Sequence, residues 1–150
     1  MRIVIQRVSQ ARVDIDGTTV GAVGQGFMVL VGVEDGDTDA DCDWLVAKTA
    51  GLRVFDDENG VMNRNIIDAG GNVLAISQFT LTASTRKGNR PSYIRAAGHE
   101  LATALYDRYC LKLGQAIGRT VERGVFGADM QVTLTNNGPV TIIIDSRLRE

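Results

Sequence analysis

The sequence contains few of the residues on which the common hydrolytic enzymes depend. Its 150 residues include one histidine, two cysteines and two prolines, and only 5% are aromatic. Cys42 and Cys110 lack the spacing of a metal or redox pair, so we expect two buried thiols. His99 has no second histidine with which to bind zinc, and no serine lies in a G-x-S-x-G elbow. These absences argue against a zinc hydrolase and against a Ser–His–Asp hydrolase.

Long hydrophobic runs are also missing. Nothing approaches the ~18 consecutive apolar residues of a membrane-spanning helix, and the start lacks the apolar core and cleavage site of a signal peptide. We therefore expect a cytoplasmic protein with no membrane partner. The glycines at 21, 24 and 26 are in the wrong order for a dinucleotide loop, and we expect no cofactor. The length suits one domain, which we place at residues 1–147, with 148–150 as a short tail without an assigned role.

Acidic residues are absent from one long segment. The net charge is −2, yet no Asp or Glu occurs between Ala69 and His99. That segment carries four cations within ten residues: Arg86, Lys87, Arg90 and Arg95. A solvated basic loop is one interpretation, and a docking surface for phosphate groups is the other.

The hydrophobic pattern predicts an α+β fold with a strongly curved, barrel-like, mostly antiparallel β-sheet and two outer helices. Two crossovers leave room for some parallel pairing. In the first half of the chain we expect a strand at 2–9, a hairpin that turns at Asp16-Gly17, a central strand at 27–33, and a helix at 37–51 capped by Thr38. A strand pair within 53–63 and a long strand at 72–81 follow. The second half then forms a helix from 97 to about 117 and three short strands, near 120, at 130–135 and at 140–145.

The stretch "LTNNGPVTII" (134–143) is contradictory. Asn137-Gly138 between two strand-like runs is a strong hairpin signal. Pro139 follows at once, where a strand would need a backbone N–H for its ladder. The residue pattern alone predicts a plain hairpin and leaves the proline unexplained.

Two further stretches place polar or glycine residues among apolar ones. Ser77-Gln78-Phe79-Thr80 interrupts a strand-like run, although backbone partners could satisfy its hydroxyls. "GVFGADMQV" (124–132) sets Phe126 between glycines, which lets backbone approach a flat ligand; a tight turn with a core phenylalanine is the simpler interpretation.

Together these segments resemble the D-aminoacyl-tRNA deacylase family. The resemblance spans essentially the whole chain and is most specific in "SQFTL" (77–81), "TRKGNRPS" (85–92), "FGADMQV" (126–132) and "NNGPVT" (136–141). It implies a cytoplasmic, homodimeric hydrolase with the fold of that family. Such an enzyme cleaves the ester of D-aminoacyl-tRNA, and of glycine mischarged on tRNA-Ala, and rejects L-aminoacyl-tRNA.

The resemblance also implies roles for individual residues. The active site would be formed at the subunit interface, with Gly138-Pro139 as a Gly-cis-Pro element inserted from the other subunit to exclude L-amino acids by its rigid carbonyls. Arg7, polar within an apolar strand, is a candidate for holding that element. The terminal 2′-hydroxyl of the tRNA would assist the attacking water, which explains why the sequence offers no catalytic base. The implied catalytic residues are Ser77, Gln78, Phe79 and Thr80. The implied substrate-binding residues are Phe126, Gly127, Ala128, Met130 and Asn136. Arg86, Lys87 and Arg90 would contact the acceptor stem of the tRNA.

Two other interpretations remain open at this point. One is a non-catalytic RNA-binding dimer that uses the same basic loop. The other is a general hydrolase of small esters.

Overall fold

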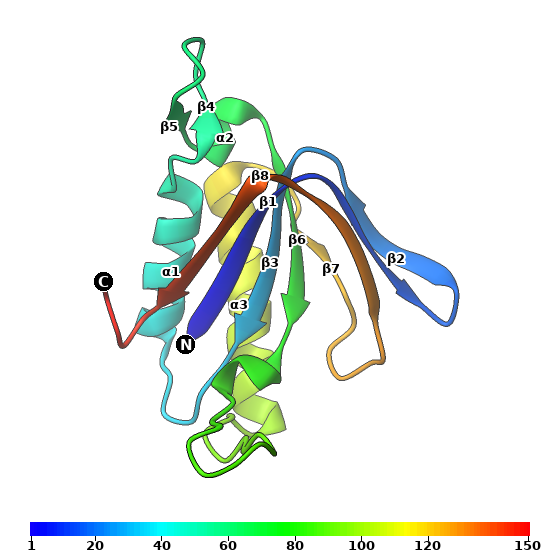
Figure 1. The fold of residues 1–150 in the computed structure, drawn as a ribbon, viewed down its shortest axis with the longest axis vertical. Helices are drawn as coiled ribbons and strands as arrows, with labels where there is room; N and C mark the ends of the chain where they lie inside the picture. The colour runs from blue at the N-terminus through cyan, green and yellow to red at the C-terminus, as the bar shows by residue number, and fades with distance from the viewer.

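Two long strands lie side by side: β1 (Arg2–Ile15), and β8 (Gln131–Asp145), which pairs with β1 along nearly its whole length. The computed structural model describes all residues, 1–150. β1 also pairs antiparallel with β2 (Thr18–Val23) and with β3 (Gly26–Gly32) along its other edge. Because β1 is shared by three neighbours and bends as it passes from β3 to β2, the sheet curls strongly upon itself (Figure 1).

The far half of the sheet is parallel. β3 pairs parallel with β6 (Asn72–Ser77), which pairs parallel with β7 (Glu122–Arg123). Each parallel pair is joined by a crossover that carries a long helix, as parallel strands require. The predicted α+β barrel-like class is confirmed, with a mixed sheet in place of a mostly antiparallel one. The hairpin at Asp16-Gly17 is also confirmed, and both of its residues have positive φ, 49° and 79°.

Two long helices cover one face of the sheet. α1 (Asp39–Gly51) begins at the predicted Thr38–Asp41 capping box, and α3 (His99–Ile117) begins two residues later than expected. The predicted strand pair is present as β4 (Phe55–Asp56) and β5 (Met62–Arg64), and a single helical turn, α2 (Ile66–Ala69), was not predicted.

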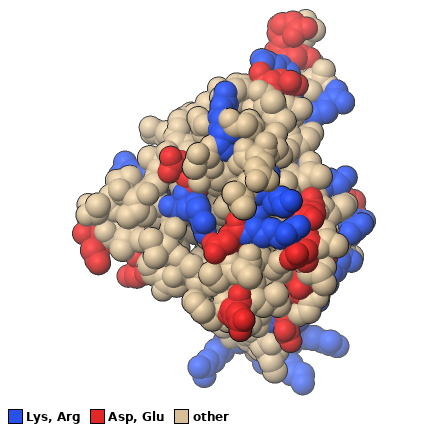
Figure 2. Space-filling model, turned by 180° about the vertical axis from the view of Figure 1, so that it is seen from behind, with Lys and Arg blue, Asp and Glu red and all other residues tan.

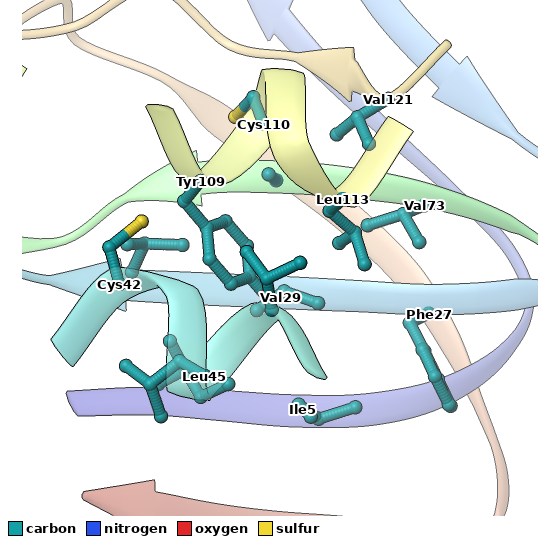
Figure 3. Close-up of a cluster of buried hydrophobic side chains, with 14 of the residues drawn as sticks. Ile5, Phe27, Val29, Cys42, Leu45, Val73, Tyr109, Cys110, Leu113 and Val121 are labelled. Atoms are coloured by element: carbon teal, nitrogen blue, oxygen red, sulfur yellow. The ribbon is translucent and has the colours of Figure 1, made fainter. Parts of the chain in front are cut away.

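The main core lies between these helices and the sheet. Figure 3 shows Leu45 and Cys42 of α1 meeting Tyr109 and Leu113 of α3 above Val29. Cys42 and Cys110 are free and buried, as expected, and burial raises the pKa of their thiols to about 12 and about 11.

The short tail packs against α1. The guanidinium of Arg149 lies 4.5 Å from the ring centroid of Trp44, and its Nε donates to the Ser146 carbonyl at 2.9 Å. None of the helices is both long and apolar enough to cross a bilayer. No cluster of three or more His, Cys, Asp or Glu side chains is arranged to hold a metal ion.

The predicted C-terminal hairpin is wrong. Residues 131–145 form one strand, and both halves run antiparallel to β1. The register jumps from Val8↔Asn136 to Gln6↔Thr141, so residues 137–140 bulge out opposite the single residue Arg7. A bulge and a hairpin use the same turn-forming residues, and the continuous partner strand β1 decides between them.

The strand predicted at 72–81 is also too long. β6 ends at Ser77, and residues Phe79–Thr82 form a 3₁₀ helix, η1. The partner strand β3 ends at Gly32, so no ladder is available beyond this point. η1 packs onto Gly32 so closely that a Cβ there would lie 2.9 Å from the Cβ of Leu81.

Candidate functional site

A cavity of about 440 Å³ lies at the C-terminal end of β6. It brings together two of the segments that the sequence singled out, Ser77–Phe79 and the loop from Phe126 to Met130. The structure adds wall residues that the sequence interpretation missed, at or near the start of α3: Ala96, Ala97, His99, Ala102 and Tyr106. The walls are mostly apolar, with the polar groups of Ser77 and Gln78 at one side.

A chain of aromatic contacts fixes Phe126 in the cavity wall. Its ring meets the His99 ring edge-on at 5.2 Å between centroids, and it packs against Tyr106 at 6.1 Å. The Tyr106 hydroxyl donates to the Ala75 carbonyl at 2.8 Å, and burial raises its pKa, so it remains a neutral donor. The wall around Phe126 is therefore set by the central strand β6 and by α3.

The polar side of the cavity lies where β6 turns into η1. Gln78 donates its backbone N–H to the Val31 carbonyl at 2.8 Å, and its side-chain Nε2 donates to Thr80 Oγ1 at 2.6 Å. Thr80 itself is half-buried and does not line the cavity. The first N–H groups of a short helix, here those of Phe79 and Thr80, have no acceptor within that helix, and no side chain caps η1. The Phe79 and Thr80 N–H groups therefore remain available as hydrogen-bond donors next to the cavity.

His99 is exposed, and its ring packs on Phe126. Its position at the first residue of α3 carries no sequence signal that distinguishes a cavity residue from an ordinary surface histidine. The sequence alone therefore predicts a surface or capping histidine at this position.

The segment Asn137–Val140 is held to the body of the molecule by Arg7. The buried guanidinium of Arg7 donates from Nε to the Asn137 carbonyl at 2.9 Å and from Nη1 to the Val54 carbonyl at 2.6 Å. Asp56 lies 3.5 Å from the same Nη1. Arg7 thus connects the bulge to the chain around β4, in agreement with the predicted holding role.

The tip of this bulge is exposed and demands glycine. The Gly138–Pro139 peptide bond is cis, and Gly138 has a φ of 137°. A Cβ at Gly138 would lie 2.9 Å from Val140 Cγ2 and 3.1 Å from Arg7 Nη2. Asn136 lies at the base of the bulge, where its Oδ1 accepts the Val140 N–H at 2.9 Å. Asn136 does not line the cavity, so its contact with substrate stays a prediction.

The bulge and the cavity of one chain lie far apart. The bulge in β8 lies opposite Arg7 of β1. Arg7 pairs with Phe27 of β3, and Phe27 pairs with Val73 of β6. Ser77 lies four residues further along β6. The separation is therefore ~13 Å along the strands and ~14 Å across three strand spacings. Within one chain, Gly138 does not reach the cavity.

The basic loop lies between η1 and α3. Arg95 makes contacts within the protein: its Nη2 lies 3.6 Å from Glu34 Oε1 and donates to the Thr82 carbonyl at 3.2 Å. Arg86, Lys87 and Arg90 remain exposed. Figure 2 shows Lys and Arg side chains projecting from the lower end of the molecule, where Figure 1 places this loop.

Comparisons with known proteins point to one family by sequence and to a shared fold by structure. A family model described as D-Tyr-tRNA(Tyr) deacylase matches residues 4–145. A D-aminoacyl-tRNA deacylase of Phocaeicola vulgatus is 60% identical over 150 residues, all of both chains, and one of Chromobacterium violaceum is 58% identical over 98% of each. Among solved structures, a c-Myc DNA unwinding element binding protein superimposes with a TM-score of 0.92 at 37% identity, over 97% of this chain and 98% of that one. A probable eukaryotic D-amino acid tRNA deacylase, 20% identical, shares the fold with a TM-score of 0.82 over 96% and 98% of the two chains.

Proposed function

The chain belongs to the D-Tyr-tRNA(Tyr) deacylase family, and we propose that it is an aminoacyl-tRNA editing hydrolase that releases D-amino acids from tRNA. Its substrates would be D-aminoacyl-tRNA and glycyl-tRNA formed by mischarging of tRNA-Ala. The observation that carries the proposal is the cavity in which Ser77, Gln78 and Phe79 face Phe126 and Met130. A mostly apolar pocket with a few polar groups at one side suits a nucleoside that carries a reactive ester.

The chemistry requires little from the protein side chains. Water attacks the carbonyl carbon of the ester, the adjacent 2′-hydroxyl of the terminal ribose accepts and relays the proton, and the 3′-oxygen leaves as a hydroxyl. The N–H groups of Phe79 and Thr80 would stabilise the negative charge on the carbonyl oxygen. The hydrogen bond from Gln78 to Thr80 supports a positioning role for Thr80, because no base is available to make it a nucleophile.

Selection of the D-amino acid would come from a second copy of the chain. The Gly138–Pro139 tip is exposed, fixed by Arg7, and too far from the cavity of its own chain to act there. In a two-fold dimer each tip can enter the cavity of its partner. There its backbone carbonyls would leave room for hydrogen or a D side chain at the α-carbon and exclude an L side chain.

The exposed surface of β8 supports such a dimer. β8 pairs only with β1, which leaves its other edge free, and Ile143 on this strand is 68% exposed. A long open edge strand with apolar side chains is a natural site for pairing with another chain.

The rest of the tRNA would be bound by the outer parts of the site. Phe126 and Met130 would hold the terminal adenine, with Gly127 and Ala128 allowing its close approach. Arg86, Lys87 and Arg90 would contact acceptor-stem phosphates without reading sequence. Asn136, at the base of the tip, would reach the substrate of the partner subunit.

The experiment is hydrolysis of matched D-tyrosyl-tRNA and L-tyrosyl-tRNA, with glycyl-tRNA as a third substrate. We expect rapid release of D-tyrosine and glycine and no acceleration for L-tyrosine. Equal, spontaneous loss of both tyrosine enantiomers would favour a non-catalytic RNA-binding dimer. Comparable hydrolysis of a D-tyrosine ester that lacks the nucleotide would favour a general small-ester hydrolase.

A further inference from the structure

Two neighbouring aromatic side chains lie exposed at the rim of the cavity. Phe79 is 57% exposed and Tyr93 is 38% exposed, and their rings meet edge-on with 5.1 Å between centroids at 73°. Single exposed apolar residues are common on protein surfaces, but a contiguous aromatic pair next to a cavity marks an interaction surface. Phe79 itself lines the cavity, so the pair continues the cavity wall outward.

Hydrogen bonds on both sides of Tyr93 fix the backbone that carries its ring. Tyr93 starts a turn that is closed by the Ala96 N–H donating to the Tyr93 carbonyl at 2.9 Å. On its other side, Ser92 and Ser84 exchange two backbone hydrogen bonds of 2.9 Å. Arg95 ties the same turn to Glu34 and to the Thr82 carbonyl at the end of η1. Rigid aromatic side chains bind at low entropic cost because little freedom remains to be lost.

The order of features along the surface fits one type of ligand. Phe79 lines the apolar cavity and contacts Tyr93. The Ser84–Ser92 bridge next to Tyr93 closes the loop that carries the exposed cations Arg86, Lys87 and Arg90. Proteins that bind single-stranded nucleic acid combine aromatic stacking surfaces with a cationic path along the backbone.

We propose that Phe79 and Tyr93 form a stacking subsite for the unpaired nucleotide that precedes the terminal adenosine. The base of that nucleotide stacks on the pair, which aligns the strand between the cavity and the basic loop. The subsite tolerates any base, because every base offers a π-face. This assignment rests on the proposed function, since it takes the cavity to hold the terminal adenosine and its ester.

The test compares esters of increasing length: D-tyrosyl-adenosine, and D-tyrosine on the 3′ end of di- and trinucleotides that end in adenosine. Tyr93→Ala should raise KM for the longer esters by roughly 5- to 150-fold, the range of base–aromatic stacking, and leave KM for D-tyrosyl-adenosine unchanged. Tyr93→Phe keeps the ring and should behave as wild type. Ile94→Ala is the matched control, because Ile94 is 88% exposed in the same turn and adjoins Tyr93.

An abasic penultimate nucleotide makes the test independent of folding. It should raise KM for the wild-type protein, and raise it by less in Tyr93→Ala, which keeps only Phe79 of the stacking pair. Equal effects of Tyr93→Ala on all esters, or no effect on any, would overturn the subsite. Failure of the wild-type protein to hydrolyse any of the D-esters would instead overturn the proposed function itself.

Discussion

Replacing Arg7 should separate the bulge at Gly138–Pro139 from the body of the molecule. Arg7 is buried and donates to two backbone carbonyls, those of Asn137 at 2.9 Å and Val54 at 2.6 Å. Arg7→Met keeps a long apolar stem but removes every donor, which leaves both carbonyls without their partner. Arg7→Lys keeps the charge, but its single ammonium group lacks the fork that spans the two carbonyls.

The expected loss of stability can be calculated from the two hydrogen bonds of Arg7. A hydrogen bond that involves a charged group contributes ~1.5–3 kcal/mol, so loss of both bonds in Arg7→Met should lower the free energy of unfolding by ~3–6 kcal/mol. For a domain of this size the lower figure corresponds to a fall in Tm of roughly 6–12 °C. Arg7→Lys should lie between Arg7→Met and wild type.

Urea unfolding and thermal melting measure the stability, and hydrolysis of D- and L-tyrosyl-tRNA measures the function. We expect kcat/KM for D-tyrosyl-tRNA to fall and discrimination against the L substrate to weaken in both variants. Asp56→Asn is the control, because this carboxylate lies 3.5 Å from Arg7 and is 55% exposed. A loss below ~1 kcal/mol in Arg7→Met would show that Arg7 does not hold the bulge, since no other donor bridges Asn137 and Val54.

Three further predictions concern other parts of the molecule. Alanine at Arg86, Lys87 or Arg90 should raise KM for tRNA substrates and reduce the salt dependence of binding by about one unit per contact, while D-tyrosyl-adenosine is unaffected; an unchanged salt dependence would remove the loop from the interface. The pKa values of the Cys42 and Cys110 thiols are raised by burial to about 12 and about 11, so both should resist alkylation at pH 8 and react only in urea. Because these pKa values are raised in the folded state, the protonated thiols stabilise the folded protein, and this stabilisation is complete below their unfolded pKa of ~8.5. It is lost as the pH rises through 11–12. A free energy of unfolding that does not decline in this alkaline range would contradict the burial of the two thiols. The D-tyrosyl ester of a tRNA with a 2′-deoxy terminal adenosine should be hydrolysed far more slowly than that of the unmodified tRNA. An unchanged rate would indicate that Thr80 takes part in the chemistry.

Much of the architecture was predictable because local signals and tertiary contacts agree. The capping box at Thr38, the hairpin at Asp16-Gly17 and the buried central strand β3 all appear where the sequence places them. The residues of two motifs, Ser77–Phe79 and Phe126–Met130, also meet in one cavity. Their convergence requires the parallel pairing of β3 with β6 and the return of the chain through α3.

The failures occur where a distant partner decides the outcome. Asn137-Gly138 carries a hairpin signal, yet β1 pairs with the residues on both sides of it and converts the turn into a bulge. β6 stops at Ser77 because β3 ends at Gly32, which no local pattern reveals. Tyr93 and His99 carry no motif of their own, and only the folded chain places them beside Phe79 and Phe126.

We propose that the Gly138–Pro139 tip of one chain completes the cavity of another, and mixing two inactive variants distinguishes this arrangement from a site within one chain. Gly138→Leu disables the tip, and Ala128→Trp fills the cavity, so each homodimer should be inactive towards D-tyrosyl-tRNA. In a heterodimer, the intact cavity of the first variant receives the intact tip of the second, which restores one of two sites. Random mixing in equal amounts should therefore recover about a quarter of wild-type activity. A mixture that stays inactive, although it forms heterodimers, would show that tip and cavity act within one chain and would contradict the account.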